Sequence, residues 1–161
     1  MKILVLNCGS SSIKYKMFDM TTSQVLAQGG VEKVGLPGSF LKLTDSNDEK
    51  VVLEKDIPDH QTGVDFILGT LTDKKHGCIK SLKEIQAVGH RVVHGGEKFN
   101  ASVLITPEVI AQIKECFELA PLHNPANLIG IEAIDKSLPG IQQVAVFDTA
   151  FHQSMQPKVY M

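Results

Sequence analysis

Residues 7–14, which read NCGSSSIK, follow the apolar segment 3–6 and form the first cluster that could do chemistry. A tight Gly/Ser turn can point several backbone N–H groups and hydroxyls at a phosphate, with the Lys14 ammonium nearby. The spacing is not that of a Walker A loop, in which Gly-x4-Gly-Lys-Ser/Thr opens a helix. A plain hairpin turn is the alternative, because Gly and Ser are common in turns.

Residues 89–96, which read GHRVVHGG, form the second cluster. His90 and His94 would suit a metal ion if this segment were helical. The two valines and the glycine pair favour a strand instead, which projects Arg91 and Val93 from the same face. A guanidinium beside an apolar side chain could hold a small carboxylate. An ion pair between Arg91 and a structural acid is the alternative.

Two further candidates follow later in the chain. Asp148 comes directly after the apolar run 144–147, and an aspartate at the end of a buried strand needs a hydrogen-bond, metal or functional partner. His123 lies within residues 120–125 (APLHNP), just before a helix start, where the helix dipole favours anions. A structural turn aspartate and a surface histidine are the respective alternatives.

The elements that must position these residues begin with strands. Alternating apolar residues over 13–18, preceded by a turn, predict a hairpin, and a third strand over 25–31 completes a meander. Residues 33–59 are rich in Gly, Pro, Asp and Asn. They carry short strand candidates at 40–43 and 51–53, so we expect an inserted hairpin there.

From residue 60 onward the pattern becomes helical, with four apolar residues at i, i+3, i+4 and i+7: Val64, Ile67, Leu68 and Leu71. A strand is expected over 85–93. Thr106-Pro107 predicts a helix start, and Asn124-Pro125 repeats that signal for a helix to residue 136. The run 144–147 predicts a strand covered on both faces. The order indicates an α/β fold, a mixed sheet flanked by helices.

Composition limits the function classes. The 161 residues carry 16 Lys and Arg against 18 Asp and Glu, 43% are hydrophobic and 21% charged, as in ordinary globular domains. Disorder and nucleic-acid binding through bulk charge are therefore not expected. No apolar run approaches the ~20 residues that span a bilayer. The three cysteines lack CxxC spacing, which favours a reduced cytoplasmic setting over a disulfide scaffold or zinc ribbon.

Together the segments 7–14, 89–96, 120–125 and 146–152 resemble, in order, four sequence segments of the acetate kinase family. The resemblance covers residues 1–161. It implies the actin, Hsp70 and sugar-kinase superfamily fold, whose first domain is a ribonuclease-H-like βββαβαβ mixed sheet. It also implies direct in-line phosphoryl transfer, ATP + acetate ⇌ ADP + acetyl phosphate.

The resemblance implies a role for each candidate. Arg91 would bind the acetate carboxylate, Val93 and Leu122 would line the slot for its methyl group, and Asp148 would be the catalytic aspartate that orients acetate or the Mg²⁺ complex. His123 would donate a hydrogen bond to the phosphoryl oxygens during transfer. The phosphate side would be held by a second set of residues: Ser10, Ser12 and Lys14 for ATP, and Asn7 for Mg²⁺.

The family's proteins are more than twice as long as this chain. The resemblance assigns the adenosine site, a transition-state histidine and arginine, and a metal-binding glutamate to a second domain, so we expect an N-terminal domain that is inactive alone. A homodimer, with its interface largely in that second domain, is also implied. A propionate or butyrate kinase, or a stand-alone module that binds phosphate or nucleotide without turnover, are the alternatives.

Overall fold

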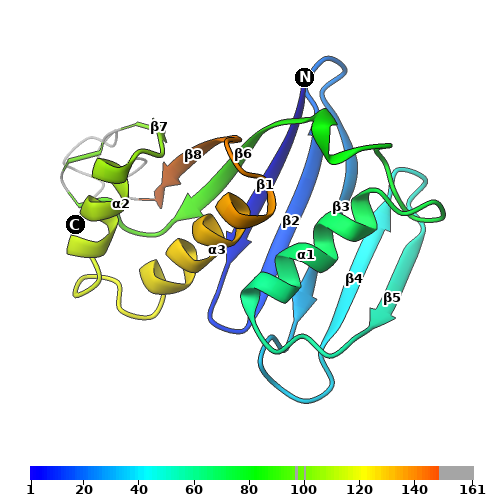
Figure 1. Cartoon of the computed structure of the whole chain (residues 1–161), viewed down its shortest axis with the longest axis horizontal. Helices are drawn as coiled ribbons and strands as arrows, with labels where there is room; N and C mark the ends of the chain where they lie inside the picture. The colour runs from blue at the N-terminus through cyan, green and yellow to red at the C-terminus, as the bar shows by residue number, and fades with distance from the viewer. Residues whose placement is uncertain (97, 100, 149–161) are drawn as a thin grey trace, which may run out of the picture.

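The computed structural model describes residues 1–96, 98–99 and 101–148, which form one eight-stranded mixed sheet with three α-helices (Figure 1). The strands are β1 (Lys2–Cys8), β2 (Ser12–Asp19), β3 (Gln24–Glu32), β4 (Phe40–Asp45), β5 (Lys50–Glu54), β6 (Ile85–Val92), β7 (Val103–Leu104) and β8 (Gln142–Phe147). The helices are α1 (His60–Leu71), α2 (Pro107–Glu115) and α3 (Asn124–Ser137), with a 3₁₀ turn at Leu82–Glu84.

The sheet has two halves that meet at β1. Its strand order is β5-β4-β3-β2-β1-β6-β8-β7, in which β1 to β5 pair antiparallel while β6 is parallel to both β1 and β8. The predicted meander and mixed sheet are therefore confirmed, and β4 and β5 pair as an antiparallel hairpin within residues 33–59. The two-residue β7 was not predicted, because so short a strand carries no periodicity; it pairs antiparallel with β8.

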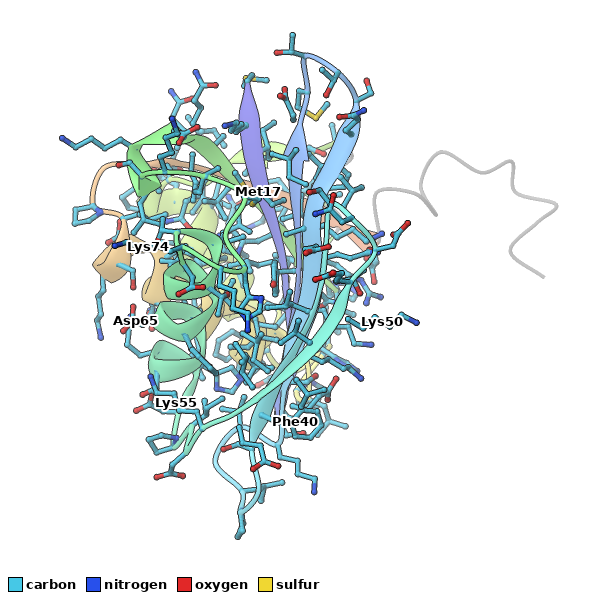
Figure 2. All side chains as sticks on the ribbon, turned by 90° about the vertical axis from the view of Figure 1, so that its right-hand side faces the viewer. Met17, Phe40, Lys50, Lys55, Asp65 and Lys74 are labelled. Carbon is cyan, nitrogen blue, oxygen red and sulfur yellow. The ribbon has the colours of Figure 1, made fainter. Side chains whose placement is uncertain are left out.

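One face of the sheet carries the helices. Figure 2 shows α1 and α3 on one side, with Asp65 in the helix layer and Lys50 pointing away from it on the other side. The period of two in β1 matches this arrangement, because Leu4, Leu6 and Cys8 are buried beneath the helices while Val5 is exposed on the opposite face. We call that opposite surface the open face.

The expectation that residues 144–147 are covered on both faces is wrong for the described part of the chain. Ala145 and Phe147 are buried, but Val146 is 48% exposed on the open face. A short apolar run predicts burial of each side chain equally, whereas the covering depends on which faces the helices reach. Within the described residues, no helix combines the length and hydropathy that a membrane crossing requires.

Helix α3 can approach β1 closely because it has a glycine at the contact. A Cβ on Gly130 would overlap Cys8 Sγ and lie 3.0 Å from Cys8 Cβ. Cys8 is the last residue of β1 and precedes the Gly/Ser turn of residues 9–11, which we call the candidate phosphate turn. This contact therefore sets how near α3 lies to the end of β1.

We expect Gly130→Ala to lower the free energy of unfolding by about 1–3 kcal/mol, because the new methyl group overpacks the contact with Cys8. Gly69→Ala is the matched control. It also lies in a helix, but no atom beyond its chain neighbours and its own helix backbone lies within 4 Å of the position that its methyl group would take. Better helix propensity should therefore raise stability by about 0.5–1 kcal/mol. Urea unfolding of the three proteins measures both changes, and equal effects would contradict the close-contact explanation.

Candidate functional site

The parallel strands bring three candidate residues to one edge of the sheet. Asn7 lies near the carboxyl end of β1, Arg91 near that of β6, and Asp148 directly after β8. The register pairs Leu6 with His90 and Arg91 with Val146. Side chains at paired positions share a face and alternate along each strand, so Asn7 and Arg91 belong to the open face. Asp148 joins them there through its ion pair with Arg91.

Arg91 and Asp148 form a bidentate ion pair. Arg91 Nε donates to Asp148 Oδ1 and Oδ2 at 3.0 and 3.1 Å, and Arg91 Nη2 donates to Oδ2 at 2.7 Å. The bond to this carboxylate raises the pKa of Arg91 above its ordinary value. The side chains are 52% and 35% exposed, so the pair contributes about 1 kcal/mol or less to stability. The acid that pairs with Arg91 is thus itself a candidate site residue.

The candidate phosphate turn is a hairpin, as predicted, and it is anchored from several sides. Gly9 N donates to Ser12 O at 2.8 Å, which closes the turn between β1 and β2. His60, at the start of α1, has its Nε2 2.7 Å from Gly9 O. Because a carbonyl only accepts, Nε2 carries the proton and donates. Sequence reasoning missed His60, since 51 residues separate it from the turn.

Lys14 lies on the same face as Asn7, because the antiparallel register pairs these two residues directly. Ser10 is exposed in the turn, and Ser12 opens β2. Asn7 and Lys14 both line a groove of about 720 Å³ that runs over the open face from β1 to β5. Arg91 and Asp148 are not among its lining residues.

The N-terminus of α3 lies at the same edge. His123 is its N-cap residue and makes no side-chain capping bond, while the neighbouring Leu122 is 76% exposed. The expectation that Asn124 caps this helix is wrong: its side chain is buried and bonds to His94 instead. Within the described residues, no bond joins His123 to Arg91 or Asp148.

The two histidines of the second cluster have separate environments. The segment is a strand as far as Val92, one residue short of the predicted end, and His94 lies beyond it. His90 is 2% exposed, with its Nε2 2.6 Å from Gln143 Oε1. His94 Nδ1 accepts a bond from Gly96 N at 2.9 Å. In the part of the chain that the structure describes, no three His, Cys, Asp or Glu residues are grouped to hold a metal ion. The histidine-based metal site therefore has no support.

Burial of His90 makes stability depend on pH. Desolvation lowers the pKa of His90 from 6.5 to about 4. Between these values the unfolded chain binds a proton that the folded protein does not, so stability falls by up to about 1.4 kcal/mol per pH unit as pH decreases. We expect His90→Gln to flatten the dependence of unfolding free energy on pH between 6.5 and 4, measured by urea titration. An unchanged slope would contradict the assignment.

Comparison with known proteins decides the family. The family model described as the acetokinase family matches residues 2–161. The chain belongs to the acetokinase family. It is 67% identical over 161 residues to an acetate kinase of Parabacteroides distasonis and 70% identical over 160 residues to one of Porphyromonas gingivalis. The two matches include 100% and 99% of this chain but only 40% of each relative. The relatives are therefore more than twice as long as this chain, as expected.

Solved structures of relatives share the fold. The crystal structure of Porphyromonas gingivalis acetate kinase matches with a TM-score of 0.94 at 69% identity, over 98% of this chain and 39% of that one. A propionate kinase from Francisella tularensis matches with a TM-score of 0.86 at 41% identity, also over 98% and 39%. The predicted α/β fold of an actin-like kinase is therefore confirmed. Of the fourth sequence segment, residues 149–152 lie outside the described residues.

Proposed function

We propose that the complete protein transfers the γ-phosphoryl group of ATP to acetate, and that this chain supplies the acetate side and part of the phosphate side. The observation that carries the proposal is the Arg91–Asp148 ion pair at the ends of two parallel strands, on the same face as Asn7 and Lys14. Family membership supports it, because the Parabacteroides distasonis and Porphyromonas gingivalis relatives, 67% and 70% identical, are acetate kinases.

Arg91 is well placed to bind a carboxylate. A guanidinium has five N–H donors, and Asp148 occupies only the edge formed by Nε and Nη2. Within the described residues, the Arg91 guanidinium bonds to no other group, which leaves its Nη1 edge for acetate. Val93 and Leu122 line the methyl slot in this proposal. Acetate is ionised at neutral pH and needs no base, so Asp148 acts by orienting Arg91 and the reacting groups.

The phosphate side is assigned to the turn and to β2. Ser10 and Ser12 offer hydroxyls, Lys14 offers an ammonium group, and His123 donates to the phosphoryl oxygens during transfer. Asn7 and Asp148 have the oxygen ligands that Mg²⁺ prefers, and a magnesium ion that keeps several waters fits so open an edge. When bound, Mg²⁺ neutralises phosphate charge. Phosphoryl transfer depends on positioning and charge neutralisation. In this proposal these residues supply both for the acetate side and for part of the phosphate side.

The remaining parts of the site are assigned to a second domain, which would bring the adenosine site and further transition-state groups. A cytoplasmic homodimer belongs to the same proposal. To test the proposal, residues 1–160 of this chain are fused to the remaining part of the Porphyromonas gingivalis relative. We call this fusion the completed enzyme, and hydroxylamine traps the acetyl phosphate that it forms. Turnover by the completed enzyme supports the proposal, and its absence, with the unaltered relative active, contradicts it. Turnover by the isolated chain would contradict the need for a second domain.

In the completed enzyme we expect Arg91→Ala to raise the KM for acetate by about 10- to 100-fold or more while the KM for ATP changes little. Each lost charge-assisted hydrogen bond to the carboxylate is worth about 1.5–3 kcal/mol, and 1.4 kcal/mol is tenfold. Lys98→Ala is the control, because it removes an exposed cation from the Lys98–Glu115 ion pair elsewhere. Unchanged acetate kinetics in Arg91→Ala would remove Arg91 from the site.

We expect Asp148→Asn to lower kcat by about 100-fold or more, because loss of the charged partner lets Arg91 move, and misplacement by about 1 Å can have that effect. Stability should change by about 1 kcal/mol or less, since the pair is exposed. Glu115→Gln provides the matched control for removing a surface carboxylate. Full activity in Asp148→Asn would show that this aspartate is structural only.

The Francisella tularensis propionate kinase supports a second candidate within the same reaction class. The hydroxylamine assay separates the two when acetate, propionate and butyrate are compared in the completed enzyme. A higher kcat/KM for propionate or butyrate than for acetate would replace acetate as the proposed substrate.

A further inference from the structure

Asn127 bridges the two halves of the site. It lies in the first turn of α3, is 3% exposed, and belongs to no candidate set from the sequence. Its Nδ2 donates to Cys8 O at 2.7 Å, and its Oδ1 accepts from Val93 N at 3.1 Å. We call residues 93–94, which follow β6 and the proposed acetate ligand Arg91, the acetate segment. One side chain thus holds both Cys8, the residue after Asn7, and Val93 of the acetate segment.

The bridge begins where the backbone pairing of these strands stops. The parallel register between β1 and β6 runs only to Leu6 and His90. Beyond that pair, Cys8 still offers a carbonyl acceptor and Val93 an N–H donor. The Asn127 amide offers a donor and an acceptor on a single planar group. It therefore bonds to both Cys8 O and Val93 N, which the strand pairing leaves unpaired with each other. Helix α3 lies over β1 and β6 (Figure 1). Its first turn brings this amide to the ends of the two strands.

Asn124 provides an internal comparison. It is 0% exposed and one turn earlier on the same helix. Its Oδ1 accepts from His94 N at 3.1 Å, and its Nδ2 donates to His94 O at 2.8 Å and to Ile113 O at 3.4 Å. Asn124 therefore anchors the segment after β6 to the helices but makes no bond to β1. The two asparagines are equally buried and differ in whether they reach the phosphate turn.

We propose that Asn127 is a positioning residue that fixes the separation between the phosphate turn after β1 and the acetate segment after β6. The proposal rests on the proposed function. In-line transfer requires the acetate oxygen and the γ-phosphorus to be held at near-contact distance, and small errors in that distance lower the rate steeply. Asn124 fixes only the acetate segment, so it affects acetate binding without setting the distance between the two substrates.

The kinetic test compares Asn127→Asp, Asn127→Ala and Asn124→Ala in the completed enzyme, well below their unfolding temperatures. Asn127→Asp keeps the acceptor for Val93 N but places an oxygen against Cys8 O, so we expect kcat to fall at least about tenfold at saturating substrates. We expect the kcat of Asn127→Ala to fall as far or further. Asn124→Ala should raise the KM for acetate with kcat within about threefold of the unsubstituted enzyme.

Two kinetic outcomes would overturn the proposal. One is an unchanged kcat in both Asn127 variants. The other is an equal fall of kcat in Asn124→Ala and Asn127→Asp at matched thermal stability, because a shared loss of packing would then explain both. An inactive completed enzyme would instead overturn the proposed function, and with it the kinetic role of Asn127.

A measurement that does not depend on activity tests the bridge itself. In ¹H–¹⁵N spectra of this chain, Asn127→Ala should shift the amide signals of both Gly9, whose N–H shares a peptide unit with Cys8 O, and Val93. Asn124→Ala should shift His94 and leave Gly9 unchanged. An unchanged Gly9 amide signal in Asn127→Ala would overturn the bridge, whatever the enzyme assay shows.

Discussion

Parallel pairing of β6 with β1 and β8 is the constraint on which the site depends. Parallel strands point their carboxyl ends to the same edge of the sheet. Arg91 therefore comes close to Asn7, 84 positions earlier in the sequence, and to Asp148, 57 positions later. The shared register also puts them on one face. A shift of one residue in either pairing would turn one of these side chains into the helix layer, where a charge has no solvent.

The helix layer fixes this register from beneath. Leu4, Leu6 and Cys8 of β1 pack under α1 and α3, and Gly130 lets α3 come close to Cys8. The same helix sends Asn127 and Asn124 to the strand ends, where buried amides satisfy backbone groups that the sheet no longer pairs. Packing on one face and site geometry on the other are therefore set by the same contacts.

The exposed and the buried polar groups have different roles in this arrangement. The Arg91–Asp148 pair is solvent-accessible and contributes little to stability, and in the proposed function it leaves the Nη1 edge of Arg91 for the substrate carboxylate. The amides of Asn127 and Asn124 are enclosed, and each lost bond would leave a buried backbone group unpaired. His90 belongs with the enclosed group, since its neutral ring links β6 to Gln143 of β8 below the ion pair.

Local pattern was sufficient for most of the fold. Alternation in β2, helical spacing in α1 and the Thr106-Pro107 start of α2 are short-range signals, so the sequence predicted these elements and the candidate residues at their ends. Partners remote in sequence leave no such signal. That Asp148 pairs with Arg91, that His60 holds Gly9, and that Asn124 turns inward instead of capping α3 depend on which strands lie side by side and which face the helices cover. Only the tertiary structure decides those contacts, because each joins backbone or side-chain groups that chain folding alone brings within hydrogen-bonding distance.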